Sequence, residues 1–297
     1  MSVSRRQRTL ARPVTVTGFG YYTGRDIQVE FWPAAEYAGI SFVRHDLGPS
    51  ARIPATAAHR IDMPRRTTLE LNGARVEMVE HVLAALAGLR VDNCEVWVDA
   101  CEMPGCDGSA RAFVEAIEAA GVVEQRSPVP QIVVRQTVRV GGSDQWIEAQ
   151  PSRSAGLSIT YDLNFASYAA IGRQTYGIDL TPDSFCRELA SCRTFITEDV
   201  AQAMLAEGRG QRVTPQDLLI FGPHGPVDNS LRFSDECVRH KLLDVVGDLA
   251  LTGCEIIGHV VAHRCGHKLN AELAKRLLEQ AEANNQRFGV VAERKCA

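Results

Sequence analysis

Short stretches in which apolar and polar residues alternate recur through the first half of the chain, and each predicts a β-strand. They cover 13–17, 27–32, 39–44, 67–71 and 93–99. Two longer stretches with helical spacing lie among them, at 78–89 and 112–120. Each ends at or beside a glycine, and Ser109 is the expected N-cap of the second.

The second half has a similar layout. It predicts strands at 132–140, 146–149, 157–163, 218–221 and 254–262, and helices at 182–192, 198–207, around residue 240 and at 269–284. Each half therefore gives strands, then a helix, a strand and a helix. The residues themselves do not repeat, so an internal duplication is only a hypothesis at this point.

A polar segment with two prolines, 124–130, is the best interdomain linker in the chain. The chain has 297 residues, and a domain commonly holds about 150 residues. We therefore predict two domains, at 1–126 and 131–297.

The composition indicates an ordinary globular protein, with 45% hydrophobic and 23% charged residues. A net charge of −4 argues against general nucleic-acid binding. The basic segment 1–12 lacks the apolar core of a signal peptide, and no apolar run approaches the length of about 18 residues that spans a membrane. Nine cysteines without a Cys-x-x-Cys pair fit reduced thiols in the cytoplasm better than a disulfide framework.

A His-x-x-x-Asp pair carries the first chemical signal. On a helix His240 and Asp244 share one face and can present an imidazole and a carboxylate to one metal ion. The simpler interpretation is the solvated polar face of a surface helix. Against it, this face has short ligand-type groups, with Asp248 one turn further on, and few long Lys or Glu side chains.

Two distant segments add further candidates. Glu80 and His81 begin the helix predicted at 78–89, whose next residues are apolar, so both side chains need a partner or a metal if they are buried. A core histidine bonded to a carbonyl is the alternative for His81. His267 follows Gly266 at the start of the last helix, where a nearby carboxylate such as Asp248 would favour its charged form.

Together these groups suit amide hydrolysis. Two histidines and one aspartate leave a fourth zinc position open for water, and the pKa of such a water approaches about 7. A carboxylate beside it can act as a general base, and a cationic histidine can protonate a leaving amine and stabilise an oxyanion.

With these residues in view, the chain resembles the UDP-3-O-acyl-N-acetylglucosamine deacetylases, zinc enzymes of the committed step of lipid A synthesis. The resemblance spans nearly the whole chain. Its motifs lie, in order, at 18–24, 79–89, 91–93, 102–104, 107–110, 192–195, 231–233, 238–248, 266–267 and 270. The Glu-His pair and the His-x-x-x-Asp motif are the most specific of them.

The resemblance implies catalytic roles for the matching residues. The zinc ligands would be His81, His240 and Asp244. Glu80 would be the general base for a zinc-bound water that attacks the N-acetyl amide. His267, oriented by Asp248, would be the general acid and oxyanion stabiliser, and Thr194 would help to hold the tetrahedral intermediate.

It also implies a fold and substrate contacts. The fold is α+β, with two similar domains of sheet and helix layers, a small insert in each, and the active site at the domain interface. The second insert, a β-α-β unit at roughly 195–222, would form a hydrophobic passage for the acyl chain. Lys241 and Arg264 would face the substrate diphosphate, and Phe195 would line the pocket.

Two segments depart from the family pattern. Tyr22 stands where the family usually has a histidine, and 210–217 lacks the usual Gly-Gly-Ser element. These changes concern the N-terminal turn and the acyl passage, so they leave the identity of the acyl chain open. The zinc machinery is unaffected.

Alternatives to this function are a zinc deacetylase for a different N-acetyl sugar, a noncatalytic binding paralogue, and a metal-free acyltransferase with His240 as base. The intact ligand set opposes the paralogue, and the Glu80-His81 pair opposes the acyltransferase. We expect one zinc per chain, which Fe²⁺ could replace, and an acylated UDP-N-acetylglucosamine as substrate. We further expect no nucleic-acid partner, at most transient contact with a membrane surface, and a cytoplasmic monomer.

Overall fold

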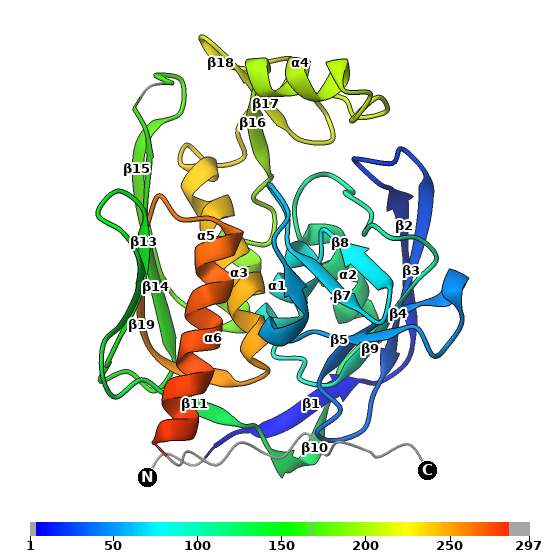
Figure 1. Ribbon diagram of the computed structural model, residues 1–297, viewed down its shortest axis with the longest axis vertical. Coiled ribbons are helices and arrows are strands. Elements are labelled where there is room, and N and C mark those ends of the chain that lie inside the picture. The colour runs from blue at the N-terminus through cyan, green and yellow to red at the C-terminus, as the bar shows by residue number, and fades with distance from the viewer. Residues whose placement is uncertain (1–3, 167, 285–297) are drawn as a thin grey trace.

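The computed structural model describes residues 4–166 and 168–284, so the domain bounds expected at residues 1 and 297 lie outside the described residues. The fold class is α+β, as predicted. Helices form a central layer between two mixed sheets, and a small lobe stands at one end (Figure 1). No helix among these residues is long and apolar enough to cross a membrane.

The two large sheets share one strand order. The first runs β2-β3-β9-β4-β5, with β4 and β9 parallel and the other neighbours antiparallel. The second runs β12-β13-β19-β14-β15, with β14 and β19 parallel and β11 also paired to β19. The strands of the first are β2 (Val14–Phe19), β3 (Asp26–Pro33), β4 (Ile40–Arg44), β5 (Arg52–Pro54) and β9 (Cys94–Val98). Those of the second are β11 (Gln131–Val133), β12 (Val138–Gly141), β13 (Trp146–Gln150), β14 (Leu157–Phe165), β15 (Gly172–Asp179) and β19 (Glu255–His263).

The helices extend this correspondence between the halves. The helices before and after β9 are α1 (Glu80–Gly88) and α2 (Arg111–Ala120), and those around β19 are α5 (Glu236–Leu249) and α6 (His267–Ala283). The equivalent helices α1 and α5 pack together at the centre (Figure 1). The topology thus supports an internal duplication that the residues alone left as a hypothesis.

Each half also has a small sheet. In the chain it lies between β5 and α1 in the first half, and between β15 and α5 in the second. In the first half it consists of β6 (Arg60–Ile61), β7 (Thr68–Leu71) and β8 (Ala74–Glu77). In the second, α3 (Pro182–Glu188) precedes β16 (Phe195–Thr197), α4 (Glu198–Ala206), β17 (Leu219–Gly222) and β18 (Gly225–Pro226). Short 3₁₀ turns complete the elements at His45–Leu47, Ala57–His59 and Ala250–Thr252.

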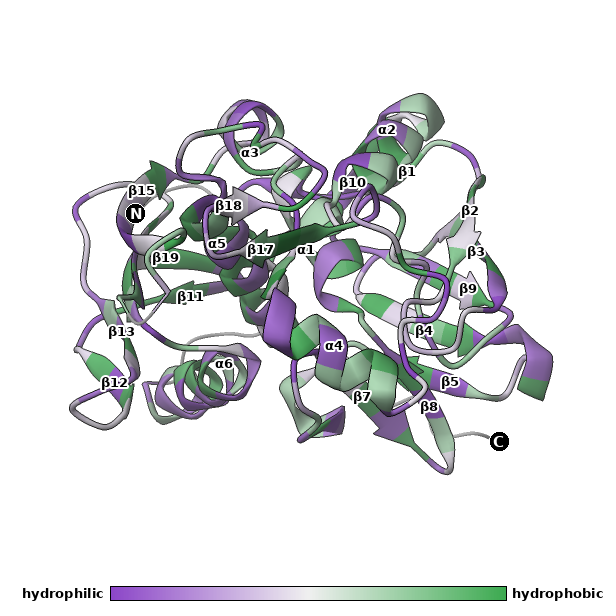
Figure 2. Cartoon of the chain, turned by 90° about the horizontal axis from the view of Figure 1, so that it is seen from above, coloured by the Kyte–Doolittle hydropathy of each residue, from purple (hydrophilic) through white to green (hydrophobic). Residues whose placement is uncertain are grey.

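The central helices α5 and α6 differ in how much of their surface is buried. Helix α6 covers the second sheet and has distinct hydrophobic and hydrophilic sides (Figure 2). Helix α5 is instead buried on nearly all sides, its polar residues His240, Asp244 and Asp248 included. The interpretation of α5 as a surface helix with a solvated face is therefore wrong.

The expected linker is ordered. Most of it belongs to strand β10 (Val122–Pro128), which pairs antiparallel with β1 (Arg6–Leu10). A two-stranded ribbon leaves many side chains in solvent, so a polar sequence can form it. Pro128, which has no N–H to donate, is its last residue.

Other elements also differ from prediction: β1, β5, β6, β8 and β16 were not predicted from the hydrophobic pattern, and the helix expected at 182–192 ends at Glu188. The strand expected at 132–140 is divided into β11 and β12. Strand β15 was not predicted, because it is an edge strand whose polar residues alternate with half-buried ones. The N-cap of α2 is Ala110, although the Ser109 hydroxyl accepts the N–H of Arg111 at 3.2 Å.

Candidate active site

Helices α1 and α5 bring together three side chains of types that can bind a metal ion. His81 from α1 and His240 and Asp244 from α5 offer ligand atoms that all lie within 4.8 Å of one another. The Nε2 atoms of His81 and His240 are 3.7 and 3.4 Å from Asp244 Oδ1. All three side chains are buried. The site therefore depends on the packing of two helices from different halves of the chain.

The protonation of these groups suits a cation. His240 Nδ1 donates to the carbonyl of Cys192 at 3.1 Å, which leaves Nε2 as the nitrogen that faces Asp244. Burial lowers the pKa of His240 to about 3, so the ring is neutral. Burial opposes ionisation of Asp244, yet the neighbouring Lys241 ammonium, together with the charged His267, holds its pKa well below the ordinary value.

One carboxylate oxygen tests whether this group fits a metal. Asp244 Oδ1 is buried and has no hydrogen-bond partner among the described residues. Such an atom costs free energy unless something binds it. The Nε2 atoms of His81 and His240 are its nearest imidazole nitrogens, at 3.7 and 3.4 Å, and neither makes a hydrogen bond to it. Two nitrogens and one carboxylate oxygen around one point therefore fit a divalent metal ion such as zinc.

A glycine allows this approach of the helices. A Cβ atom at Gly247 of α5 would lie 2.1 Å from the carbonyl oxygen of Glu80 and 2.9 Å from its carbonyl carbon. Any larger residue must push α1 away, together with Glu80 and His81. Gly247 thus sets the spacing between His81 on α1 and the His240 and Asp244 pair on α5.

A carboxylate and a histidine flank the ligands. Glu80 is buried, and burial raises its pKa. His267 donates from Nδ1 to Asp248 Oδ2 at 2.9 Å, and its Nε2 lies 4.0 Å from Asp244 Oδ2. Burial opposes the charged form of His267, but the carboxylates of Asp248 and Asp244 raise its pKa to about 9. The ring is therefore an imidazolium at neutral pH.

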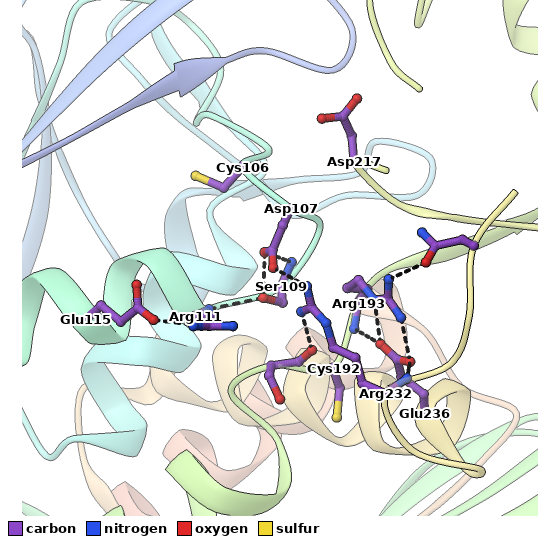
Figure 3. A network of polar contacts seen from close by, with 12 residues as sticks. Cys106, Asp107, Ser109, Arg111, Glu115, Cys192, Arg193, Asp217, Arg232 and Glu236 are labelled. Carbon is purple, nitrogen blue, oxygen red and sulfur yellow. Dashed lines mark hydrogen bonds and ion pairs between the residues drawn. The ribbon is translucent and has the colours of Figure 1, made fainter. Parts of the chain in front are cut away.

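A buried polar network holds the segment that contains Thr194 and Phe195 (Figure 3). Arg193 donates from Nε and Nη2 to the two carboxylate oxygens of the buried Glu236, at 2.8 and 3.0 Å. Arg232 pairs with Asp107 of the first half at 2.8 Å (Figure 3). The backbone N–H of Thr194 donates to Gly108, also in the first half, at 2.7 Å. The network therefore joins both halves next to the site.

A cavity of about 960 Å³ opens onto these residues. The predicted site residues that line it are Glu80, His81, Thr194, Phe195, His240, Lys241, Asp244 and His267. Its apolar part comes from the second insert and its surroundings and includes Phe165, Ile196, Val200, Met204, Leu218 and Ile220. Its polar part includes Arg60, Asp62, Arg65, Asp144 and Lys268. The cavity therefore has both apolar and charged residues in its lining, beside His81, His240 and Asp244.

The remaining predicted residues lie behind the lining. Asp248 contacts His267 from below the cavity surface. Arg264 does not line the cavity and pairs with Asp144, which does. Lys241 lines it, but its Nζ donates to Asp244 Oδ2 at 2.7 Å. Both cations that were expected to face a diphosphate are thus bonded to carboxylates.

The two departures from the family pattern belong to neighbouring segments. Tyr22 lines the cavity, and the Arg66 guanidinium stacks on its ring at 4.0 Å. The preceding Tyr21 donates its hydroxyl to the carbonyl of Asp217. The Arg212 guanidinium packs over the Phe19 ring at 4.4 Å. The N-terminal turn and the 210–217 segment therefore contact each other.

Comparison with known proteins gives the family of the chain. The sequence model of the LpxC family, UDP-3-O-acyl N-acetylglycosamine deacetylase, matches residues 7–279. The chain belongs to this family. UDP-3-O-acyl-N-acetylglucosamine deacetylases of Myxococcus xanthus and Thermosynechococcus vestitus are each 37% identical to it, over 93% and 94% of this chain and 87% and 96% of their own lengths. The bifunctional enzyme LpxC/FabZ of Chlorobaculum tepidum is 33% identical over 94% of this chain and 65% of its own length.

Several residues of this deacetylase-family site were missed in the sequence. Thr67 bonds to both Glu80 and Asp248, and Gly247 sets the helix spacing. Arg193 and Glu236 hold the segment that lines the cavity. Arg193 and Gly247 lie within the motifs of the resemblance, but the sequence did not indicate a role for any of these residues, because each acts on a partner distant in the chain.

Proposed function

We propose that this chain hydrolyses the N-acetyl group of UDP-3-O-acyl-N-acetylglucosamine and releases acetate, the committed step of lipid A biosynthesis. The observation that carries the proposal is the buried Asp244 Oδ1, which has no hydrogen-bond partner among the described residues and lies near the Nε2 atoms of His81 and His240. We infer that His81, His240 and Asp244 would hold zinc, one ion per chain. Fe²⁺ accepts the same donors.

A zinc ion held by these residues would polarise the amide carbonyl and acidify water. Glu80 is the general base. Its Oε2 is occupied by the N–H of Thr67 at 2.9 Å, so Oε1 takes the proton of the attacking water. The raised pKa of Glu80 makes it a stronger base than an ordinary carboxylate.

His267 is the general acid. Its Nδ1–H remains hydrogen-bonded to Asp248, so its Nε2–H is the group that would face the reacting amide. In its charged form it stabilises the negative charge that develops on the amide oxygen and then protonates the leaving nitrogen. The Thr194 hydroxyl, which lines the same cavity, helps to hold the tetrahedral carbon.

The cavity supports an acylated nucleotide-sugar as substrate. Its apolar lining around Phe195 suits an acyl chain, because burial of each CH₂ contributes about 0.8 kcal/mol. Lys241 and Arg264 would bind the diphosphate, and Arg264 would exchange Asp144 for a phosphate. The two-domain division and the cytoplasmic location stay predictions.

Acetate release by the zinc-loaded enzyme tests this proposal. We expect kcat/KM for UDP-3-O-acyl-N-acetylglucosamine to exceed that for UDP-N-acetylglucosamine by at least about 10²-fold, because binding of the acyl chain contributes to transition-state stabilisation. Equal values, or preference for another N-acetyl sugar, would contradict the substrate. No acetate from any of these sugars would favour a binding paralogue.

A further inference from the structure

Thr67 lies between the proposed base and the partner of the proposed acid. It directly precedes β7 and is fully buried. Its N–H donates to Glu80 Oε2 at 2.9 Å, and its hydroxyl donates to Asp248 Oδ1 at 2.5 Å. Its carbonyl accepts the N–H of Val79 at 3.3 Å, the residue before Glu80. All polar groups of Thr67 are therefore engaged at the site.

The bond to Asp248 completes the contacts of that carboxylate. Asp248 Oδ2 accepts from His267 Nδ1 at 2.9 Å and from Asn270 Nδ2 at 2.8 Å. Oδ1 accepts from Thr67. With donors on both oxygens, the carboxylate is held in one plane, and so is the imidazole bonded to it. Without the hydroxyl, Oδ1 would be a buried oxygen that lacks this donor, and the carboxylate would be free to turn.

We propose that Thr67 is a positioning residue that ties the general base of the first half of the chain to the general acid of the second. The proposal rests on the proposed function, since it assigns Glu80 and His267 those roles. Thr67 does not line the cavity, and its hydroxyl acts on His267 through Asp248. Its effect is to fix His267 relative to Glu80 across the reacting amide.

The Thr67→Val variant tests the positioning role alone, because it should change neither the folding of the chain nor the hydrogen bond to Glu80. Valine keeps the shape of threonine and the backbone N–H to Glu80, and it removes only the hydroxyl. We expect a fall of about 10- to 100-fold in kcat, with KM within about threefold and unchanged zinc content. Thr67→Ser, which restores the hydroxyl, should recover kcat to within about threefold. Thr67→Ala replaces the valine variant if the latter does not fold.

A second readout does not depend on turnover. In ¹⁵N-labelled, zinc-free protein, the Nδ1–H proton of His267 should give a protected low-field signal in the wild type and in Thr67→Ser. It should be lost or broadened in Thr67→Val. This pattern would support positioning even if the wild type released no acetate, an outcome that would overturn only the proposed function.

Two results would overturn the positioning role. One is wild-type kcat and an unchanged His267 signal in Thr67→Val. The other is a Thr67→Ser variant as impaired as Thr67→Val, because the hydroxyl would then not be the group that matters.

Discussion

Glu80→Gln should lower kcat for acetate release by roughly 10²- to 10⁴-fold while zinc stays bound. Glutamine has nearly the shape of glutamate, and its carbonyl oxygen can still accept the N–H of Thr67. It cannot accept a proton from water at neutral pH. Because Glu80 is outside the ligand set, metal content should not change. Steady-state kinetics and metal analysis of the purified variant measure both quantities.

Glu115→Gln is the matched control. Glu115 is exposed on α2 and, within the described part of the chain, pairs with Arg111 of the same helix, so its replacement should leave kcat and zinc unchanged. If Glu80→Gln retained kcat within tenfold of the wild type, Glu80 would not be the base. Loss of zinc from Glu80→Gln would instead mean that the carboxylate takes part in holding the ion.

Gly247→Ala should impair folding, metal binding and activity together. The added methyl would overlap the carbonyl group of Glu80, so α1 must move relative to α5. Overpacking of this kind costs roughly 1–3 kcal/mol of unfolding free energy. It also displaces His81 from His240 and Asp244, and a shift of about 1 Å can cost about 10²-fold in rate. Urea unfolding, zinc titration and acetate release give the three values.

Gly156→Ala is the control for this change. Apart from Gly156 itself and its chain neighbours, no described residue has an atom within 4 Å of a Cβ at Gly156, so this variant should match the wild type in all three measurements. A Gly247→Ala variant with wild-type zinc affinity and kcat would show that the α1–α5 spacing does not set the site.

The ligand group could be predicted because helical geometry is local. Four-residue spacing places His240 and Asp244 on one face wherever the helix lies. The adjacent Glu80 and His81 likewise keep their relative directions at the start of α1. Burial of both helices then follows from their apolar residues, and the structure brings the two pairs together.

The supporting residues could not be predicted, because their partners are distant in the sequence. The hydroxyl of Thr67 bonds to a carboxylate of α5, and Gly247 faces the backbone of α1. Strand β10 is a similar case. Its polar sequence indicates a linker, and only its pairing with β1 makes it a strand. Periodicity reports the environment of one element and not the identity of its neighbour.

The shared strand order explains why the site lies between the halves. The helices α1 and α5 occupy equivalent positions in the two units, and each contributes to the ligand group where they pack together. Glu80 and His81 come from one unit, and His240 and Asp244 come from the other. A single unit therefore carries an incomplete set of ligands.

The most direct test of the central claim compares zinc content and acetate release from UDP-3-O-acyl-N-acetylglucosamine in the wild type and in His240→Ala. We predict one zinc per chain and turnover in the wild type, and loss of both in the variant. A wild type that binds no zinc, or a variant that keeps zinc and turnover, would contradict the assignment of His81, His240 and Asp244 as the metal ligands of a deacetylase.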